Sequence, residues 1–219
     1  MKFTAKTLQV IRNFASINNG IQFKQGNVLK TMSESKNVMA KATLDTEVEA
    51  TFCIYDLSQF LGAVSMLDDP DLTPTDYYLQ IGKGSEKFNY KYADPGMILI
   101  APEKDIKLPS RDVEFQLKGD VLTRVMKALG VIGAPQIAVT GDREKIYLQT
   151  MNIKDPTDSS YRVEVGETTS EFNLIFLTEN IRLLPGDYDV AISSKGFAHF
   201  AGEDVDYWIT IEKDSFFKE

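Results

Sequence analysis

The order of predicted elements repeats once along the chain, and this repeat limits the fold to two similar halves. Each half is predicted to run strand, helix, strands, helix, strands. The first of the two helices in each half is amphipathic. The repeat rests on element order rather than residue identity, with a period of about 110 residues. A chain of 219 residues suits two small domains. We therefore expect domains at 1–108 and 109–219, with a polar, proline-bounded linker at about 102–112.

The first helix of each half carries positive charge, although the whole chain has a net charge of −8. In segment 4–19, apolar residues recur at helical spacing on one side, and the only charged residues, Lys6 and Arg12, fall on the other. Segment 118–133 has the same design. Its charged residues are Lys118, Asp120, Arg124 and Lys127. One face of each helix is thus expected to pack on a core, and the other to meet water or an anion.

Short β-branched or alternating runs separated by polar turns predict the strands. Their close spacing requires antiparallel neighbours, since a parallel crossover needs a dozen or more residues. The runs lie at 1–3, 21–24, 27–33, 37–44, 49–55, 77–81, 87–92, 97–101, 113–117, 136–140, 145–152, 161–165, 171–177, 188–193, 196–201 and 206–212. Further helices are predicted at 57–66 and 178–183, and the expected N-caps are Thr4, Asp56, Asp120 and Thr178. The fold class is therefore α+β.

Composition excludes several classes of protein. The sequence pI of about 4.8 argues against general attraction to nucleic acid, so any such contact must be local. The single cysteine, Cys53, rules out an internal disulfide and fits a reducing compartment. No charged-then-apolar leader opens the sequence, and no apolar run approaches the roughly 18 to 20 residues that span a bilayer. These features predict a soluble intracellular protein.

Two basic helix faces in a duplicated chain suit a curved array in which both faces point the same way. Copies joined head to tail until the rotation closes would form a ring. A ring lined by Lys and Arg would hold a phosphate backbone without reading bases. The ordinary alternative is that each polar face is merely solvated, as in most surface helices.

Long stretches of both halves carry a recognisable pattern. The first half contains KTLQVIRNFASINNGIQF at 6–23 and FCIYDLSQFLGAVSML at 52–67, and the second half contains SSYRVEVG at 159–166, EFNLIFLTENIRLLPGDYDV at 171–190 and SKGFAHFAGEDVDYWITIE at 194–212. Together these stretches resemble the DNA polymerase sliding clamp of T-even-type bacteriophages. The resemblance covers nearly the whole chain. It implies the processivity fold: two similar α+β domains per chain, antiparallel sheets outside and amphipathic helices lining the hole of a three-chain ring.

The resemblance also implies the function and the partners. The protein would encircle duplex DNA and tether the replicative polymerase, giving processive synthesis without catalysing a reaction. An ATP-driven clamp loader would place it on DNA, and transcription proteins could share the partner pocket. The location would be the cytoplasm of the infected host cell, with no cofactor and no membrane. The DNA-facing residues would be Lys6, Gln9, Arg12, Asn13, Lys118, Arg124, Lys127 and Arg182.

Two further surfaces follow from the same resemblance. The subunit interface would pair edge strands, with Tyr161, Val163 and Val165 facing Phe88, Tyr90, Met97 and Ile98 of a neighbour. The alternative is that these residues fill the inner face of their own sheet. Partner peptides would dock near the linker, at Ile106, Leu108, Pro109, Phe216 and Phe217. The two phenylalanines are either a docked plug or an exposed patch.

Signals for catalysis are weak. His199, the only histidine, is expected to be structural in a strand, and Cys53 to be buried. The run 82–85 lacks phosphate-loop spacing and fits a hairpin turn. Acidic residues at 68–71 and 155–158, with Pro70 and Pro156 among them, fit solvated turns better than a metal site. The alternatives to a clamp are a two-domain, metal-dependent hydrolase or transferase and a phage structural subunit.

Overall fold

The computed structural model describes residues 1–155 and 157–218, so Pro156 and Glu219 lie outside the described residues. The chain divides into two compact units, Met1–Lys104 and Asp105–Glu219. Each unit combines antiparallel strands with few helices, as the α+β prediction requires. Within the described residues, the structure contains no helix long and apolar enough to cross a membrane.

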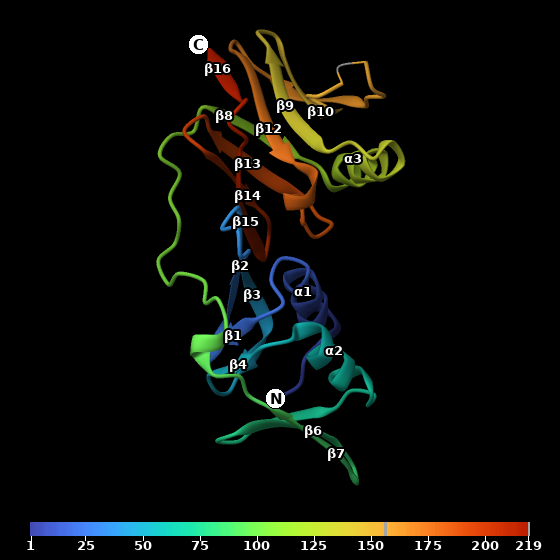
Figure 1. Cartoon of the computed structure of the whole chain (residues 1–219), viewed down its shortest axis with the longest axis vertical. Helices are drawn as coiled ribbons and strands as arrows, with labels where there is room; N and C mark the ends of the chain where they lie inside the picture. Colours follow the sequence, from blue (N-terminus) through green and yellow to red (C-terminus); the bar gives the residue numbers. More distant parts are fainter. Residues whose placement is uncertain (156, 219) are drawn as a thin grey trace. The chain divides into compact units, whose positions relative to one another are not determined.

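The first unit packs two helices beside short antiparallel strands. Its elements are α1 (Ala5–Ala15), β1 (Ile21–Phe23), β2 (Gly26–Met32), β3 (Val38–Val48), β4 (Phe52–Ile54), α2 (Leu57–Ser65), β5 (Asp71–Pro74), β6 (Tyr78–Lys83), β7 (Glu86–Lys91) and the 3₁₀ turn η1 (Pro95–Met97). Strand β1 pairs with β4, and β2 with β3, whereas β5, β6 and β7 form a separate sheet. Helices α1 and α2 pack against each other (Figure 1).

The second unit places one long helix against a larger sheet (Figure 1). Its elements are β8 (Val113–Leu117), α3 (Gly119–Ile132), β9 (Gln136–Asp142), β10 (Lys145–Met151), β11 (Arg162–Glu167), β12 (Glu171–Leu177), η2 (Thr178–Asn180), β13 (Tyr188–Ser193), β14 (Phe197–Ala201), β15 (Val205–Thr210) and β16 (Phe216–Lys218). One sheet has the order β11-β10-β9-β12-β16. In the other, β13 pairs with both β8 and β14, and β14 pairs with β15.

The two units share a pairing scheme that matches the predicted repeat. The first strand after the helix pairs with the fourth, β1 with β4 and β9 with β12. The second pairs with the third, β2 with β3 and β10 with β11. Three consecutive antiparallel strands follow in each unit. The main difference is that α2 has 9 residues, whereas its counterpart η2 is a single turn of 3.

Each unit has its own apolar core. In the first, Phe23 stacks on Phe52 with ring centroids 4.9 Å apart and contacts Phe60, and the buried face of α1 contributes Ile11 and Phe14. In the second, Leu122, Val125 and Leu129 of α3 are buried. Fully burying side chains of this kind contributes roughly 1.5 to 3 kcal/mol each.

The predicted end of the first helix is wrong. Helix α1 ends at Ala15 rather than near Asn19, because its last turn tightens: the Ser16 N–H donates to the carbonyl three residues earlier, that of Asn13, at 3.0 Å. The Asn18 side chain holds the turn that follows. Its amide donates to the Met32 carbonyl at 2.9 Å, and its oxygen accepts from the Gly20 N–H at 3.0 Å. Thr4 is the N-cap, as predicted, and accepts from the Thr7 N–H at 3.0 Å.

Two predicted caps are wrong, whereas Asp56 does cap α2. Asp120 lies inside the first turn of α3, and the N-cap is Lys118. Thr178 lies within η2, and its hydroxyl donates to the Ala134 carbonyl instead of capping a helix. The expected helix at 178–183 is therefore only one 3₁₀ turn.

Four strand assignments differ from the sequence prediction. Residues 1–3 form no strand, although Met1 and Leu72 exchange backbone hydrogen bonds. Residues 97–101 form no strand either, because the Asp94 side chain accepts from the Gly96 N–H and starts η1. The short strands β5 and β16 were not predicted. Their sequences contain charge or lie beside a proline, so alternation is not visible.

Candidate functional site

The outward side of α1 carries the predicted DNA-facing group. Lys6, Gln9 and Arg12 are exposed, and Asn13 is half-buried. Their direction follows from the opposite face, where Thr7, Val10, Ile11 and Phe14 are buried. Because residues three and four apart share a helix face, the four polar side chains form one continuous surface.

An aspartate from β3 secures the start of α1. The Asp45 carboxylate accepts from the Thr4 hydroxyl at 2.7 Å and from the Thr7 hydroxyl at 2.6 Å. Thr7 is fully buried and also lies 3.1 Å from the hydroxyl of Thr46. These hydrogen bonds hold the pKa of Asp45 below its ordinary value, and the bond from Thr7 contributes more than the bond from Thr4. The helix is therefore fixed to β3 by a charge-assisted contact.

The cations of α3 differ in their surroundings. Lys118 pairs with Asp187 at 3.2 Å, and Arg124 pairs with Asp120 at 2.7 Å. Lys127 is exposed and has no ion pair among the residues that the structure describes. Arg182 is exposed just beyond η2. Exposed ion pairs of this kind are worth about 0 to 1 kcal/mol, so an incoming anion could exchange with them.

Asp187 performs the role that the sequence assigned to Asp120. Its carboxylate accepts from the Gly119 N–H at 2.8 Å, and the Lys118 ammonium lies on its other oxygen. The hydrogen bond from the Gly119 N–H lowers the pKa of Asp187, and the hydrogen bond from Lys118 lowers it further. A carboxylate at a helix N-terminus is stabilised by the exposed N–H groups and the helix dipole. Because Asp187 is 68 residues away from Gly119, local pattern could not reveal this cap.

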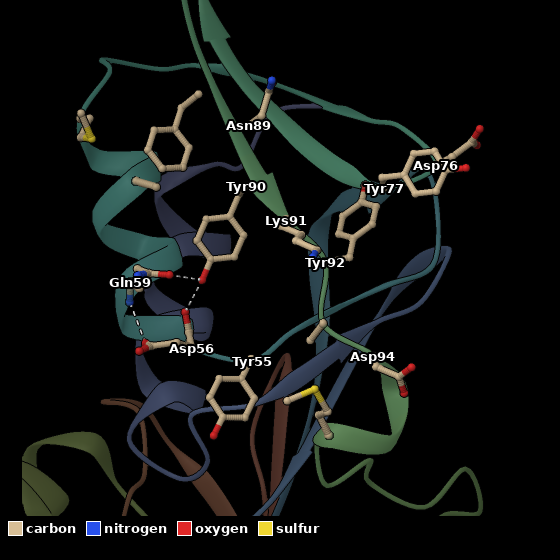
Figure 2. Close-up of a pocket in the computed structure, with 15 residues that line it drawn as sticks. Tyr55, Asp56, Gln59, Asp76, Tyr77, Asn89, Tyr90, Lys91, Tyr92 and Asp94 are labelled. Atoms are coloured by element: carbon tan, nitrogen blue, oxygen red, sulfur yellow. Dashed lines mark hydrogen bonds between the residues drawn. The ribbon is translucent and has the colours of Figure 1, made fainter.

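A hollow with an aromatic rim lies between α2 and β7 in the first unit (Figure 2). Its volume is about 950 Å³. The lining residues are Tyr55, Asp56, Gln59, Ala63, Met66, Asp76, Tyr77, Phe88, Asn89, Tyr90, Lys91, Tyr92, Ala93, Asp94 and Met97. Tyr77 is 77 % exposed, Met66 70 % and Met97 64 %. Exposed apolar side chains gathered in one hollow mark an interaction surface.

Tyr90 forms the fixed floor of this aromatic hollow. Its hydroxyl donates to the carbonyl of Asp56 and contacts Oε1 of Gln59, both at 3.0 Å (Figure 2). Its ring meets Phe60 edge to face, with centroids 5.3 Å apart. Burial raises the pKa of Tyr90. Tyr90 is therefore a core residue, and only a small part of its side chain is exposed in the hollow.

The other predicted interface residues fall into two groups. Phe88 is 38 % exposed and Met97 is exposed, both at the aromatic hollow, whereas Ile98 packs over Gly20. Tyr161, Val163 and Val165 are half-buried at β11, the outer strand of its sheet. Strand β7 likewise ends the sheet β5-β6-β7. Both strands therefore present one row of backbone groups that their own sheet does not pair.

The predicted partner-pocket residues lie in different settings. Phe217 is half-buried on β16 and stacks on Phe172 at 5.9 Å, whereas Phe216 is 42 % exposed. The pair is thus one docked ring and one exposed ring. Ile106 and Leu108 are half-buried, and Pro109 is exposed, in a segment without regular structure.

Residues set aside for catalysis have structural surroundings. His199 on β14 stacks on Trp208 at 4.7 Å and lies 2.9 Å from the Asp206 carboxylate. Cys53 is buried, which raises its pKa. Residues 82–85 form the β6–β7 hairpin, as predicted. Among residues 1–155 and 157–218, no three His, Cys, Asp or Glu side chains are grouped to hold a metal ion.

Sequence reasoning missed some residues of these surfaces. Tyr55 and Tyr77 border the aromatic hollow, and Asp45 and Asp187 fix the helix starts. The density of tyrosines at 77–78 and 90–92 was a usable signal for the hollow. The two aspartates offered none, since their partners are distant in sequence.

Comparison with family models matches both units. Residues 2–100 match the model described as DNA polymerase processivity factor, and residues 114–213 match that described as gp45 sliding clamp, C terminal. The chain is 30 % identical to a sliding clamp of Vibrio phage KVP40 over 97 % of this chain and 99 % of that protein. It is 29 % identical to the sliding clamp of Enterobacteria phage T4, covering 98 % of each.

Solved structures share the fold at low sequence identity. A PCNA from A. fulgidus, solved with a C-terminal region of FEN-1, has a TM-score of 0.72 at 13 % identity, covering 98 % of each chain. The DNA polymerase III subunit beta from Borrelia burgdorferi has a TM-score of 0.71 at 9 % identity, covering 98 % of this chain and 64 % of that one. These likenesses confirm the predicted clamp fold.

Proposed function

This chain belongs to the sliding clamp family, and we propose that three copies close into a ring around duplex DNA and tether the replicative polymerase. The observation that carries the proposal is the match to a phage sliding clamp over nearly the full length of both proteins. The two family models, which fall one in each unit, support it. Such a ring acts by topology, because a closed ring cannot leave DNA sideways.

The lining of the ring is proposed to come from α1 and α3. The exposed polar face of α1, with Lys6 and Arg12, is the part of the first unit that suits a phosphate backbone in a chain of net charge −8. Lys127 and Lys118 would serve the second unit, with Arg182 beyond η2. Few cations and no base-reading pattern favour contacts without sequence preference, which permit sliding.

The subunit interface is proposed to join β7 of one copy to β11 of the next. Both are outer strands of their sheets, and pairing them would satisfy the backbone groups that each presents. The aromatic hollow beside β7 would receive the half-buried Val163 and Val165 side of β11. The exposed aromatic and methionine side chains of the hollow supply the apolar area that such a contact needs.

The linker and β16 are proposed to receive short apolar peptides from partners. Exposed Phe216 and half-buried Ile106 and Leu108 support this assignment. The partners would be the replicative polymerase, an ATP-driven clamp loader and transcription proteins, in the cytoplasm of the infected host cell. The clamp itself would catalyse no reaction. The family match gives no support to a metal-dependent hydrolase, a transferase or a structural subunit.

The test begins with native mass by analytical ultracentrifugation over a wide concentration range. A three-chain species supports the ring, and a monomer at every concentration contradicts it. The second step replaces Lys6, Arg12 and Lys127 together by alanine. We expect unchanged mass but reduced loading onto nicked circular DNA and reduced stimulation of polymerase, because phosphate contacts are lost. Unchanged stimulation would reject the proposed lining.

A further inference from the structure

The end of the linker is tied to the second unit by a short chain of hydrogen bonds. The Ser110 hydroxyl lies 2.8 Å from Oδ2 of Asp112 and 2.7 Å from the hydroxyl of Ser193. Ser193 is the last residue of β13 and is fully buried. Because Ser110 and Ser193 are 83 residues apart, the tertiary fold, rather than a local turn, holds the linker here.

The direction of these hydrogen bonds follows from the chemistry of the groups. An ionised carboxylate can only accept, whereas a serine hydroxyl has one proton to donate and can also accept. Ser110 therefore donates to Asp112, and the proton between the two serines must come from Ser193. The Ser193 oxygen also accepts from the Lys195 N–H at 3.2 Å. Ser110 thus uses both its donor and an acceptor position.

Asp112 connects the same group to the turn between β13 and β14. Its Oδ2 accepts from the Ser194 N–H at 2.8 Å and from the Ser194 hydroxyl at 2.7 Å. The Asp112 N–H donates to the Ile192 carbonyl at 2.9 Å, one residue before β8 begins. Hydrogen bonds to an ionised carboxylate are stronger than those between neutral groups. The Ser110 end of the linker is therefore firmly fixed.

The other end of the linker is held by more exposed contacts within the first unit. Lys24 Nζ lies 2.5 Å from Oε1 of Glu103, and Lys30 Nζ donates to the Glu103 carbonyl at 2.6 Å. The Glu103 side chain is 82 % exposed, so salt screens its ion pair and the pair contributes little. Order in the segment between the two ends thus depends mainly on Ser110.

We propose that Ser110 is a positioning residue for partner binding, whose two hydrogen bonds hold the linker so that the half-buried Ile106 and Leu108 are already in place for a partner's apolar peptide. This inference rests on the proposed docking of apolar peptides at the linker. A segment that is ordered beforehand loses less conformational entropy when a peptide binds, and the complex is tighter for that reason.

The test is Ser110→Ala, which removes both hydrogen bonds and leaves Asp112 with its contacts to Ser194. We expect backbone amides of residues 104–110 to exchange with deuterium about threefold to tenfold faster, the range for losing a hydrogen bond to a charged group at a partly exposed site. Binding of the replicative polymerase from the same phage, measured by calorimetry, should weaken by a similar factor.

Two further variants serve as matched comparisons. Ser110→Thr keeps the hydroxyl and should restore both exchange and polymerase affinity to within about twofold of wild type, since the donor and acceptor remain. Lys107→Ala, at an exposed position of the same segment, keeps the Ser110 contacts and should leave exchange unchanged. Circular dichroism melting and sedimentation check that every variant is folded and assembles like wild type.

The outcomes separate this inference from the proposed function. If Leu108→Ala leaves polymerase affinity unchanged, the proposed peptide site is wrong and the inference falls with it. If Leu108→Ala weakens binding but Ser110→Ala does not, only the inference is overturned, whether or not exchange becomes faster. A Ser110→Thr protein as impaired as Ser110→Ala overturns it too, because the effect would not come from the hydroxyl.

Discussion

Gly141 is a residue at which packing leaves no room for a side chain. A Cβ placed there would lie 2.4 Å from the Phe172 ring, far inside contact distance. Phe172 is almost fully buried and stacks on Phe217 of β16 at 5.9 Å. The glycine therefore lets β9 approach the ring that anchors the final strand.

Replacing Gly141 by alanine should destabilise the protein by about 1 to 3 kcal/mol, because a ring in a packed core must move. Urea unfolding measures this change as a lower transition midpoint. In the double variant with Phe172→Leu, the smaller leucine side chain should relieve the clash. The double variant should therefore lose less stability than the sum of the losses in the two single variants. Full additivity would argue against the close approach.

Thr7 is a polar residue inside the buried face of α1, where its hydroxyl serves Asp45 and Thr46. Thr7→Val keeps the shape but removes the donor, and it should cost about 1 to 2 kcal/mol at neutral pH. Because the folded pKa of Asp45 is depressed, this stabilisation is present above the ordinary carboxyl pKa and is lost as pH falls through the folded value.

The difference between wild type and Thr7→Val should therefore narrow on acidification below about pH 4, the ordinary carboxyl range. Chemical unfolding at a series of pH values tests this. Thr123→Val on α3 removes an exposed hydroxyl and should show no such trend. A gap between the two proteins that is constant with pH would mean that Asp45 is not the relevant partner.

At the scale of elements, the two basic helices begin and end by different means. Helix α1 has Thr4 as its N-cap and Ser16, in right-handed geometry, as its C-cap. Helix α3 starts against Asp187 and ends at Gly133, which has a φ of 70°. Only glycine adopts this conformation without steric cost. The C-terminal end of α3 thus depends on one residue.

Gly133→Ala should lower stability by about 1 kcal/mol, because the left-handed conformation strains any Cβ. Gly130→Ala, three residues earlier on the same helix with open space around it, should instead raise stability by up to about 1 kcal/mol. Thermal unfolding of the two variants should therefore move in opposite directions. A loss of stability in both would point to helix packing rather than to the C-cap.

At the scale of the whole molecule, the proposed ring depends on pairing between the outer strands β7 and β11 of neighbouring subunits. Phe88→Asp on β7 or Val163→Asp on β11 would place a charge in that contact. Each variant should sediment as a monomer and lose retention on circular DNA while remaining folded. Lys87→Ala, at an exposed position of β7, should leave the mass unchanged. A stable trimer in both aspartate variants would place the subunit interface elsewhere.

The sequence by itself determined the α+β class, the order of most elements and the exposed faces of α1 and α3. Hydrophobic period, Asp56 as a cap and the turn at 82–85 are local signals, because each depends on residues a few positions apart. The resemblance to phage clamps also indicated the clamp fold, which the solved structures confirm. The same resemblance also supplied the candidate lining residues, such as Lys6 and Arg12.

Only the tertiary structure decided which distant residues complete those elements. Asp187 caps α3, and Asp45 holds Thr7, through contacts that join segments far apart in sequence. The tyrosines of the aromatic hollow stand out in the sequence, but the hollow itself forms only because α2 and β7 pack beside each other. Long-range packing, rather than residue type, assigns these side chains their roles.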